Sequence, residues 1–526
     1  MSSTNGDETP AIPLLAKVGA LADRFCHACM LLFLAATTLL TLVVTATMPH
    51  YTYQIELSFV AAPLVAVGTL AFVALLRSQR FLAWLDSLDE HRLMSVLAIY
   101  FAVAGICWVT LANVWPAWDA GDVDAVANEI LAGARVAPDS YASRFPYQIP
   151  LAALVSALKW VFGDASYQAF ELLNVASVVA TAYGVRSLAR NVFEDERTTK
   201  LSILLMFLFL PLVLYCTFQY GNLVALSFCV KALSLQVDYF KHGTMICGVR
   251  AVVLACVGTL IKSSMVVVLA GMVVAWLVNA LKQARAASLA LVVISLAAHL
   301  AFGAASGAFA RIALGVDQSN STPRVAWIAM GLQGGVGPGN YNPGWFNSDW
   351  LWSSSYMNDA YDPQRIGEDS RKSIRQSLET FVHDPAFAAT FFVVKYIAEW
   401  CQPDFEALLT SNWTYTDSDE PPMAERTMSA PLYSIYYGKA NTAMMALLDC
   451  YQFALALGAL AAICMQGLRD IERLAPLLVC AGTALLYLFW EAQSQYIMHA
   501  YVLMVPYAAF GLQRLSRVPQ TTRLHA

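Results

Sequence analysis

The sequence predicts an all-α polytopic membrane protein with about 12 transmembrane helices, interfacial helices and two large outer loops. Two observations predict this class. Of the 526 residues, 58% are hydrophobic and only 13% are charged, whereas soluble proteins carry about a quarter charged residues. Apolar stretches of roughly the 20 residues that a helix needs to cross a membrane recur along nearly the whole chain. A single anchor on a soluble domain is therefore excluded.

Hydropathy places the membrane helices in order along the chain. They are expected at residues 27–48, 57–76, 93–113, 167–185, 201–217, 221–239, 246–260, 263–281, 286–305, 443–466, 474–490 and 496–513. Two further apolar segments do not fit this set, because 149–162 is short and 387–400 carries Lys395 and Glu399 within its apolar run. We expect both to lie at the membrane surface as interfacial helices.

Lysine and arginine favour the cytoplasmic side of short loops, and they predict the orientation here. Five loops carry them, and all five fall on one side if both termini are cytoplasmic. These are the loops with Arg77, Arg80 and Arg92; with Arg186, Arg190, Arg197 and Lys200; with Lys241 and Arg250; with Lys282 and Arg285; and with Arg469 and Arg473. Two long loops, after residue 113 and after residue 307, then face outward.

Four regions follow from this layout. They are a cytoplasmic tail at 1–26, an N-terminal transmembrane module at 27–306 that includes the outer loop 114–166, a large outer loop region with a surface helix at 307–442, and C-terminal transmembrane helices with a short cytoplasmic tail at 443–526. The net charge of −5 is small and the basic residues are scattered, so no nucleic-acid partner is predicted. Cys26 and Cys29 have a metal-like spacing but lack a second pair, so no zinc site is predicted.

The first outer loop gathers carboxylates directly beyond a membrane helix: Asp119, Asp122, Asp124 and Glu129. In a helix, Asp122 lies one turn after Asp119. Neighbouring carboxylates beside lipid raise one another's proton affinity, as a general base requires. A solvated acidic helix N-terminus explains the same pattern equally well. We predict no cofactor and no metal, because no second acidic cluster stands nearby, and a divalent cation bound through carboxylate oxygens stays open as an alternative.

Two cations near this loop have more than one interpretation. Arg144 precedes the apolar segment 149–162, where its guanidinium either holds a phosphate bidentately or reaches to lipid headgroups. Lys262 interrupts an apolar run, which is costly enough in a membrane to suggest a role. Binding a phosphate, pairing with a carboxylate and reaching to headgroups are the three alternatives for Lys262.

The remaining polar candidates lie in outer turns. Tyr220 is in a tight turn between two helices. The second loop is rich in glycine and aromatic residues, which suits sugar binding, although an interfacial aromatic belt has the same composition. Its candidates are Arg324, Trp327, Tyr341 and Trp345. Between the last two helices, Glu491, Gln493, Gln495, Tyr496 and His499 either complete a site or form an ordinary polar turn.

These motifs, taken in order, resemble a known family. Pro116-x-x-Asp119 followed by Ala127 and by the stretch from Tyr141 to Gln148 is similar to the first outer loop of GT-C glycosyltransferases, especially bacterial relatives of the protein O-mannosyltransferases of the family 39 type. The resemblance extends to Pro506. Two helices ahead of 93–113 are extra to the simplest plan of that family, and Gln495-Tyr496 stands where such relatives often have an Arg-Tyr pair.

The resemblance implies an inverting transfer of a sugar from a polyprenyl-phosphate donor to a glycan, lipid or protein acceptor, at the outward face of a bacterial plasma membrane. In the resemblance, Asp119 matches the catalytic base, and Arg144 and Lys262 match phosphate contacts. From the residues themselves, we add Asp122 as a second catalytic candidate and Arg324 as a further phosphate contact. The candidates for sugar or acceptor contacts are Tyr220, Trp327, Tyr341, Trp345, Glu491 and Tyr496.

Three other functions stay open from the sequence. A transporter or lipid flippase would need intramembrane charges along a pathway, and no internal repeat supports it. A polysaccharide polymerase or ligase would use basic residues of the second loop, for which Arg324 and Arg371 are available. A non-catalytic membrane scaffold is the third.

Overall fold

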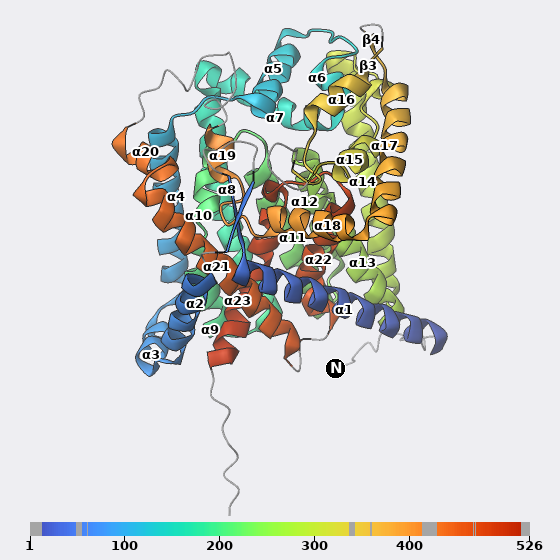
Figure 1. The fold of residues 1–526 in the computed structure, drawn as a ribbon. Coiled ribbons are helices and arrows are strands. Elements are labelled where there is room, and N and C mark those ends of the chain that lie inside the picture. The colour runs from blue at the N-terminus through green and yellow to red at the C-terminus, as the bar shows by residue number, and fades with distance from the viewer. Residues whose placement is uncertain are drawn as a thin grey trace, which may run out of the picture.

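The computed structural model describes residues 13–48, 55–59, 62–335, 342–357, 360–412, 429–465, 468 and 470–516. Nearly all of this part is helical (Figure 1). Two short antiparallel pairs of strands are the exception, β1 (Thr45–Thr47) with β2 (Glu56–Ser58) and β3 (Tyr356–Met357) with β4 (Ala360–Tyr361). The predicted all-α membrane class is confirmed.

Each predicted membrane span corresponds to a helix or a bent helix pair. These are α1 (Pro13–Val43), α2 (Ala62–Arg77) with α3 (Gln79–Ser87), α4 (Glu90–Ala112), α8 (Ser166–Phe193), α9 (Glu196–Met206) with α10 (Leu210–Leu214), α11 (Asn222–His242), α12 (Met245–Ile261), α13 (Val266–Gln283), α14 (Ala286–Leu314), α21 (Lys439–Cys464), α22 (Ile471–Phe489) and α23 (Met498–Ser516). Eight helical stretches of the described residues are long and apolar enough to cross a membrane, or up to 10 if each bent pair counts as one span.

The predicted number of spans is higher because some of these helices are short or bent. The α2–α3 pair bends by 68°, where Ser78 caps α3 by accepting a hydrogen bond from the Phe81 amide. The α9–α10 pair bends by 50°, and Pro211 stands in the first turn of α10. Helix α12 has only 17 residues. Hydropathy alone therefore predicted these bent or short helices as whole spans.

Helix α1 begins 14 residues before the predicted span, inside the segment predicted to be a tail. Its first turns pack on the end of α13: Asp23 forms an ion pair with Lys282 at 2.8 Å, and Gly19 lies so close to Lys282 that an added Cβ would be 2.8 Å from the Lys282 Cα. The close approach and the ion pair explain why helix continues through this polar stretch.

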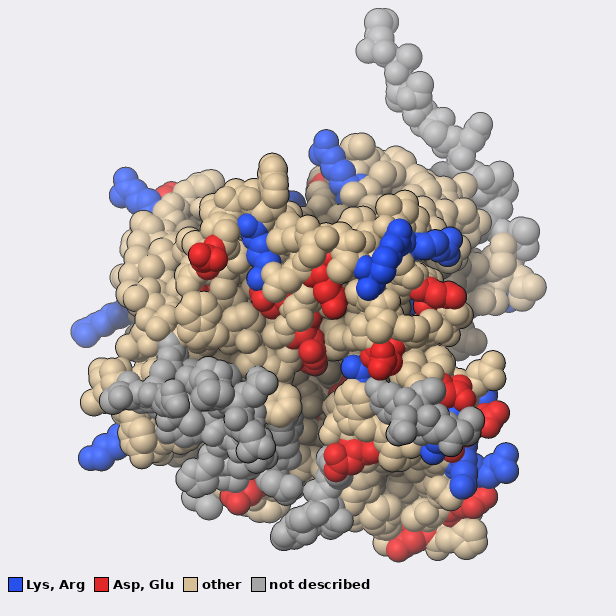
Figure 2. Space-filling view, turned by 90° about the horizontal axis from the view of Figure 1, so that it is seen from above, with Lys and Arg blue, Asp and Glu red and all other residues tan. Residues whose placement is uncertain are grey.

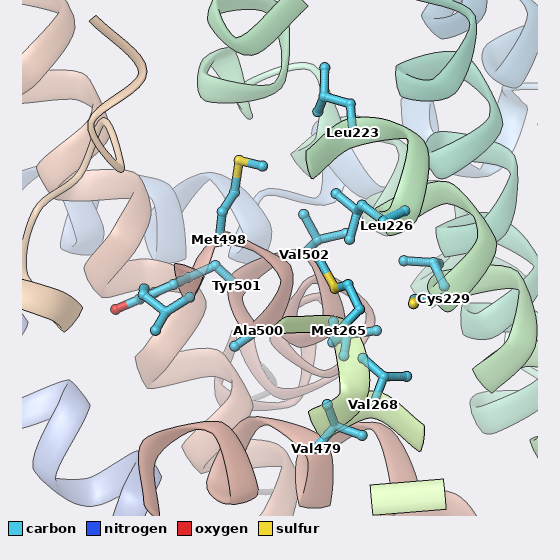
Figure 3. Close-up of a cluster of buried hydrophobic side chains, with 14 of the residues drawn as sticks. Leu223, Leu226, Cys229, Met265, Val268, Val479, Met498, Ala500, Tyr501 and Val502 are labelled. Carbon is cyan, nitrogen blue, oxygen red and sulfur yellow. The ribbon is translucent and has the colours of Figure 1, made fainter. Parts of the chain in front are cut away.

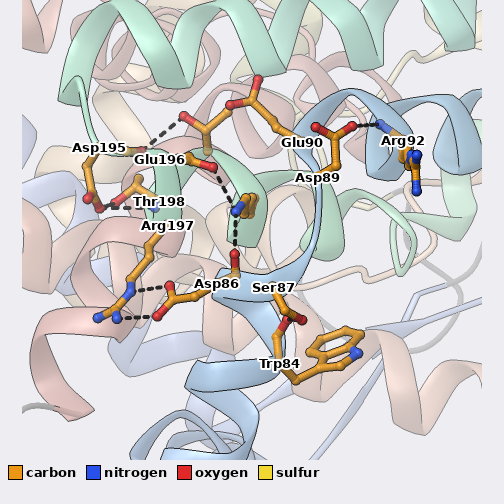
Figure 4. Close-up of polar contacts among 12 residues, drawn as sticks. Trp84, Asp86, Ser87, Asp89, Glu90, Arg92, Asp195, Glu196, Arg197 and Thr198 are labelled. Atoms are coloured by element: carbon orange, nitrogen blue, oxygen red, sulfur yellow. Dashed lines mark hydrogen bonds and ion pairs between the residues drawn. The ribbon is translucent and has the colours of Figure 1, made fainter.

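The five basic loops meet at one end of the bundle, called the basic end below, at the bottom of Figure 1. Ion pairs join them in series: Arg186 with Glu90 at 2.6 Å, Arg197 with Asp86, Lys241 with Glu194, and Lys282 with Asp470 at 3.3 Å. Figure 4 shows the contacts around Asp86 and Arg197. Arg473 acts electrostatically on Glu194, and Arg469 lies outside the described residues. The shared side predicted from lysine and arginine is therefore present in the fold.

The opposite end, called the loop end, is built from shorter helices. They are α5 (Trp118–Ala132), α6 (Tyr141–Arg144), η2 (Pro146–Gln148), α7 (Ile149–Phe162), α15 (Val325–Gly331), α16 (Ser348–Ser355), α17 (Pro363–His383), α18 (Pro385–Trp400), α19 (Ala407–Asn412) and α20 (Ala430–Tyr436). Segment 149–162 forms the separate short helix α7, which packs against α5.

Helix α18 covers residues 387–400, for which an interfacial position is predicted. Its C-terminal half is enclosed by protein, with Lys395 at 0% and Glu399 at 2% exposure. The protein itself therefore supplies polar partners for Lys395.

The apolar core lies between the long helices. Figure 3 shows one part of it, where α11, α13 with the preceding turn η5 (Ser263–Met265), α22 and α23 meet. The labelled side chains are Leu223, Leu226, Cys229, Met265, Val268, Val479, Met498, Ala500, Tyr501 and Val502. Helices α21 and α23 approach each other closely. A Cβ added at Gly511 would overlap the Gly458 carbonyl oxygen and lie 2.8 Å from the Ala462 nitrogen. Only glycine at this position lets the two backbones approach so closely.

The α21–α23 contact predicts the effect of adding one methyl group. Gly511→Ala should destabilise the protein by about 1–3 kcal/mol, because neither backbone can move away without repacking the core. Gly303→Ala in α14 is the matched control, since a Cβ there meets nothing within 4 Å. Thermal unfolding in detergent checks the pair. Equal melting temperatures for Gly511→Ala and wild type would contradict the packing described here.

Candidate functional site

Five of the predicted site residues meet at the loop end, and they come from four separate segments. Asp119 lies in the first turn of α5, Tyr220 precedes α11, Lys262 follows α12, and Glu491 and Tyr496 lie between α22 and α23. Each is placed by the end of a helix rather than by its middle. We call these five residues the outer cluster.

Lys262 is at the centre of the outer cluster. It ends α12 by adopting an extended conformation, φ −140° and ψ 106°, and its side chain is only 5% exposed. Its Nζ lies 3.6 Å from the centroid of the Tyr220 ring and 5.8 Å from that of Tyr496. Burial lowers the pKa of Lys262 to about 7, although Asp119 and Glu491 oppose this shift. An aromatic face and two carboxyl groups therefore stabilise its charge.

Asp119 is partly buried at the start of α5. Burial raises the pKa of its carboxyl group, while a hydrogen bond from Tyr220 and the charge of Lys262 act in the opposite direction. The preceding residue, Trp118, has φ +50°, a left-handed conformation that is costly for a bulky residue. The backbone is thus held in an unusual conformation directly beside the candidate base.

Glu491 is buried, with 2% exposure, and faces two lysines. Burial raises its pKa to about 8, and Lys395 and then Lys262 oppose this shift. The Tyr496 hydroxyl donates a hydrogen bond of 3.5 Å to Glu491 Oε1, and the Tyr496 ring stacks on Tyr487 with centroids 5.7 Å apart. The turn between the last two helices is therefore part of the site.

Three residues without a predicted role also contact or adjoin the outer cluster. Gln148 Nε2 donates a 2.5 Å hydrogen bond to the Tyr220 hydroxyl, and Tyr220 is also hydrogen bonded to Tyr141. Tyr147 lies close enough to Asp119 and Glu491 for their charges to act on its hydroxyl group. All three belong to the Tyr141 to Gln148 stretch, so the motif was visible but the roles of its residues were not.

The structure separates the three aspartates of the first loop. The Asp122 side chain is exposed, although the surrounding protein removes part of its water. This desolvation and the charge of Asp119 raise the pKa of Asp122 to about 6, and the charge of Arg144 opposes the shift. Asp124 forms an ion pair with Lys159 at 2.9 Å and accepts a 3.4 Å hydrogen bond from Gln219. Only Asp119 has Lys262 and Tyr220 as partners.

The other predicted residues lie around the outer cluster or apart from it. The Arg144 guanidinium lies over the Trp352 ring, 4.2 Å from its centroid. Trp327 packs edge-on against Tyr147 with centroids 6.1 Å apart. Arg324 is exposed, and Trp345 is buried in the core with 3% exposure. Tyr341 lies outside the described residues.

Acidic groups are prominent on this face. Figure 2, which looks down on the loop end, shows acidic side chains toward the middle of the face with basic side chains beside them. In the part of the chain that the structure describes, no three of His, Cys, Asp and Glu come together in a way that could hold a metal ion. Asp119, Asp122 and Asp124 are therefore not part of such a group.

The raised pKa of Glu491 predicts a pH effect on stability. The Glu491 carboxyl group binds its proton more tightly in the folded protein than in the unfolded chain, where its pKa is the ordinary 4.5. Its contribution to the free energy of unfolding is therefore complete below about pH 4.5 and is lost as the pH rises to about 8. Glu491→Gln should therefore lose less stability than wild type across this range. Melting temperatures measured against pH check this, with the exposed Glu368→Gln as control. A Glu491→Gln profile parallel to wild type would exclude the burial of an ionisable group there.

Fold and site together define a polytopic, all-helical membrane protein with a cluster of buried ionisable and tyrosine side chains at one end of its helix bundle. The chain belongs to the family described as conserved hypothetical integral membrane protein, whose model matches residues 20–345. The match includes α5, Tyr220 and Lys262, but not Glu491 or Tyr496.

Comparison with known proteins gives two solved structures. One is the oligosaccharyltransferase of Archaeoglobus fulgidus in the apo form, with a TM-score of 0.41 and 12% identity over 82% of this chain and 51% of that one. The other is the oligosaccharyltransferase AglB of the same organism in complex with an inhibitory peptide and a dolichol-phosphate, with a TM-score of 0.42 and 14% identity over 81% and 50%. This chain thus spans about half the length of both. No curated protein matches it.

Proposed function

We propose that the protein is a membrane glycosyltransferase that moves a sugar from a polyprenyl-phosphate donor to a hydroxyl of a glycan, lipid or protein acceptor, with inversion at the anomeric carbon. The observation that carries the proposal is the outer cluster itself: a buried lysine, Lys262, beside a partly buried carboxyl group, Asp119, at the end of a membrane helix bundle. The order of motifs from Pro116 onward supports the same reading.

The reaction needs a base and a counter-charge for the leaving group. Asp119 accepts the proton of the acceptor hydroxyl as that oxygen forms a bond to the anomeric carbon. The bond from the anomeric carbon to the phosphate oxygen breaks, and the lipid phosphate leaves with one more negative charge. A phosphate is a good leaving group, so no general acid is needed, unlike in glycoside hydrolysis.

Lys262 is the residue best placed to offset the charge of the leaving phosphate. It is buried, and an electrostatic interaction is stronger where water is excluded. Tyr220 shares contacts with both groups, since it donates a hydrogen bond to Asp119 and places its ring under Lys262. Arg144, near the exposed Asp122, is the candidate for a second phosphate or acceptor contact at the rim.

A polysaccharide polymerase or ligase has less support. It would use basic residues of the second loop, and both Arg324 and Arg371 are exposed rather than gathered at the outer cluster. We place the reaction on the outward face of a bacterial plasma membrane, because the outer cluster lies at the end opposite the basic loops.

The proposal predicts that one aspartate carries the reaction. In lipid nanodiscs with a panel of radiolabelled polyprenyl-phosphate sugars, Asp119→Asn should lower transfer by about 100- to 10,000-fold, the range for loss of a general base. Donor binding should persist. Asp124→Asn is the matched control, because Asp124 is already paired with Lys159. Wild-type transfer by Asp119→Asn would overturn the assignment of the base, and absence of transfer with every donor would overturn the proposed function.

A further inference from the structure

Lys395 is a buried cation for which the proposed reaction has no direct use. It lies in α18 and is 0% exposed. Its Nζ donates hydrogen bonds to three backbone carbonyl oxygens, those of Gly331 at 2.7 Å, Leu488 at 3.2 Å and Trp490 at 2.8 Å. An ammonium group has three N–H donors, so these three bonds use all of them.

The three carbonyls belong to the C-terminal ends of two helices. Gly331 is the last residue of α15, Leu488 lies in the last turn of α22, and Trp490 is the residue that caps α22. Carbonyls at a helix C-terminus have no partner within the helix and carry the negative end of its dipole. One ammonium group therefore neutralises two helix ends at once and joins them.

Close backbone packing surrounds this joint. A Cβ added at Gly331 would lie 2.7 Å from the Glu491 nitrogen, and one added at Gly344 would lie 2.7 Å from Lys395 Nζ. The Glu491 amide donates a 2.8 Å hydrogen bond to the Trp327 carbonyl of α15. The segment that carries Glu491 is thus held against α15 and against the second loop.

We propose that Lys395 is a positioning residue for the outer cluster, which fixes Glu491 beside Lys262 by joining the C-terminal ends of α15 and α22. Its charge also acts directly on the Glu491 carboxyl group. The role in turnover rests on the function proposed above, whereas the joint between the two helix ends does not depend on it.

Lys395→Met tests the proposal, because methionine keeps most of the chain length and removes every donor. Hydrogen–deuterium exchange of wild-type and variant protein in nanodiscs should be faster by at least about tenfold in peptides covering residues 325–333 and 486–496. In the transfer assay, kcat should fall by about 100-fold, as for a misplaced active-site group, with the donor KM within about threefold. Lys200→Met is the control, since Lys200 is also buried, with 3% exposure, but lies at the basic end.

Gly344→Ala provides a second test that leaves Lys395 in place. The added Cβ would push the Lys395 side chain away from its three carbonyls, so exchange and kcat should change as in Lys395→Met. Gly344 also has φ +75°, and Gly243→Ala controls for that strain, because Gly243 has φ +68° and nothing lies within 4 Å of its added Cβ. The double variant should be no worse than Lys395→Met alone.

The two readouts separate the two proposals. Faster exchange in both variants without transfer by any protein supports the joint and refutes the proposed function. Unchanged exchange in Lys395→Met refutes the positioning role whatever the transfer rate. Should Lys395→Met not fold, Gly344→Ala compared with Gly243→Ala decides the question alone.

Discussion

Lys262 and Glu491 are buried and Asp119 is partly buried at the end of an apolar helix bundle, and the segments of the loop end bring these three ionisable groups together. A single charge there is expensive, because neither lipid nor packed side chains replace the water that it loses. Lys262 reduces that cost for each carboxyl group, and each carboxyl group reduces it for Lys262, whereas Asp119 and Glu491 oppose one another's charge. Tyr220 adds both a ring face and a hydroxyl. Removing Lys262 would therefore leave two carboxyl groups of like charge without their shared counter-charge.

The same constraint explains how the segments are joined. Each charged residue stands at a helix end: Asp119 begins α5, Lys262 ends α12, and Glu491 follows α22. Helix ends have unpaired amides or carbonyls that suit polar partners. Lys395 donates hydrogen bonds to carbonyl oxygens at the C-terminal ends of both α15 and α22. The outer helices thus supply polar contacts at helix ends to groups that membrane-spanning helices alone would not hold in place.

Most helices could be predicted from the sequence because hydropathy is a local signal, and the basic loops likewise predicted a shared end. The failures concern tertiary partners. Lys395 in an apolar run looked like a surface residue, since its carbonyl partners come from segments some 64 and 95 residues away. For Lys262 the sequence left three roles open, and the fold adds Asp119 and Glu491 as its charged neighbours. Tyr141 and Gln148 stood in a recognised motif, but their bonds to Tyr220 depend on the packing of α6 and η2 against the turn before α11.

The most direct test is a structure of the protein with a non-cleavable phosphonate analogue of a polyprenyl-phosphate sugar. We expect the phosphonate to lie within hydrogen-bond distance of Lys262 Nζ and the anomeric carbon to face Asp119. A headgroup bound at the basic end, or bound at the loop end away from Lys262, would contradict the claim that the outer cluster is the donor site.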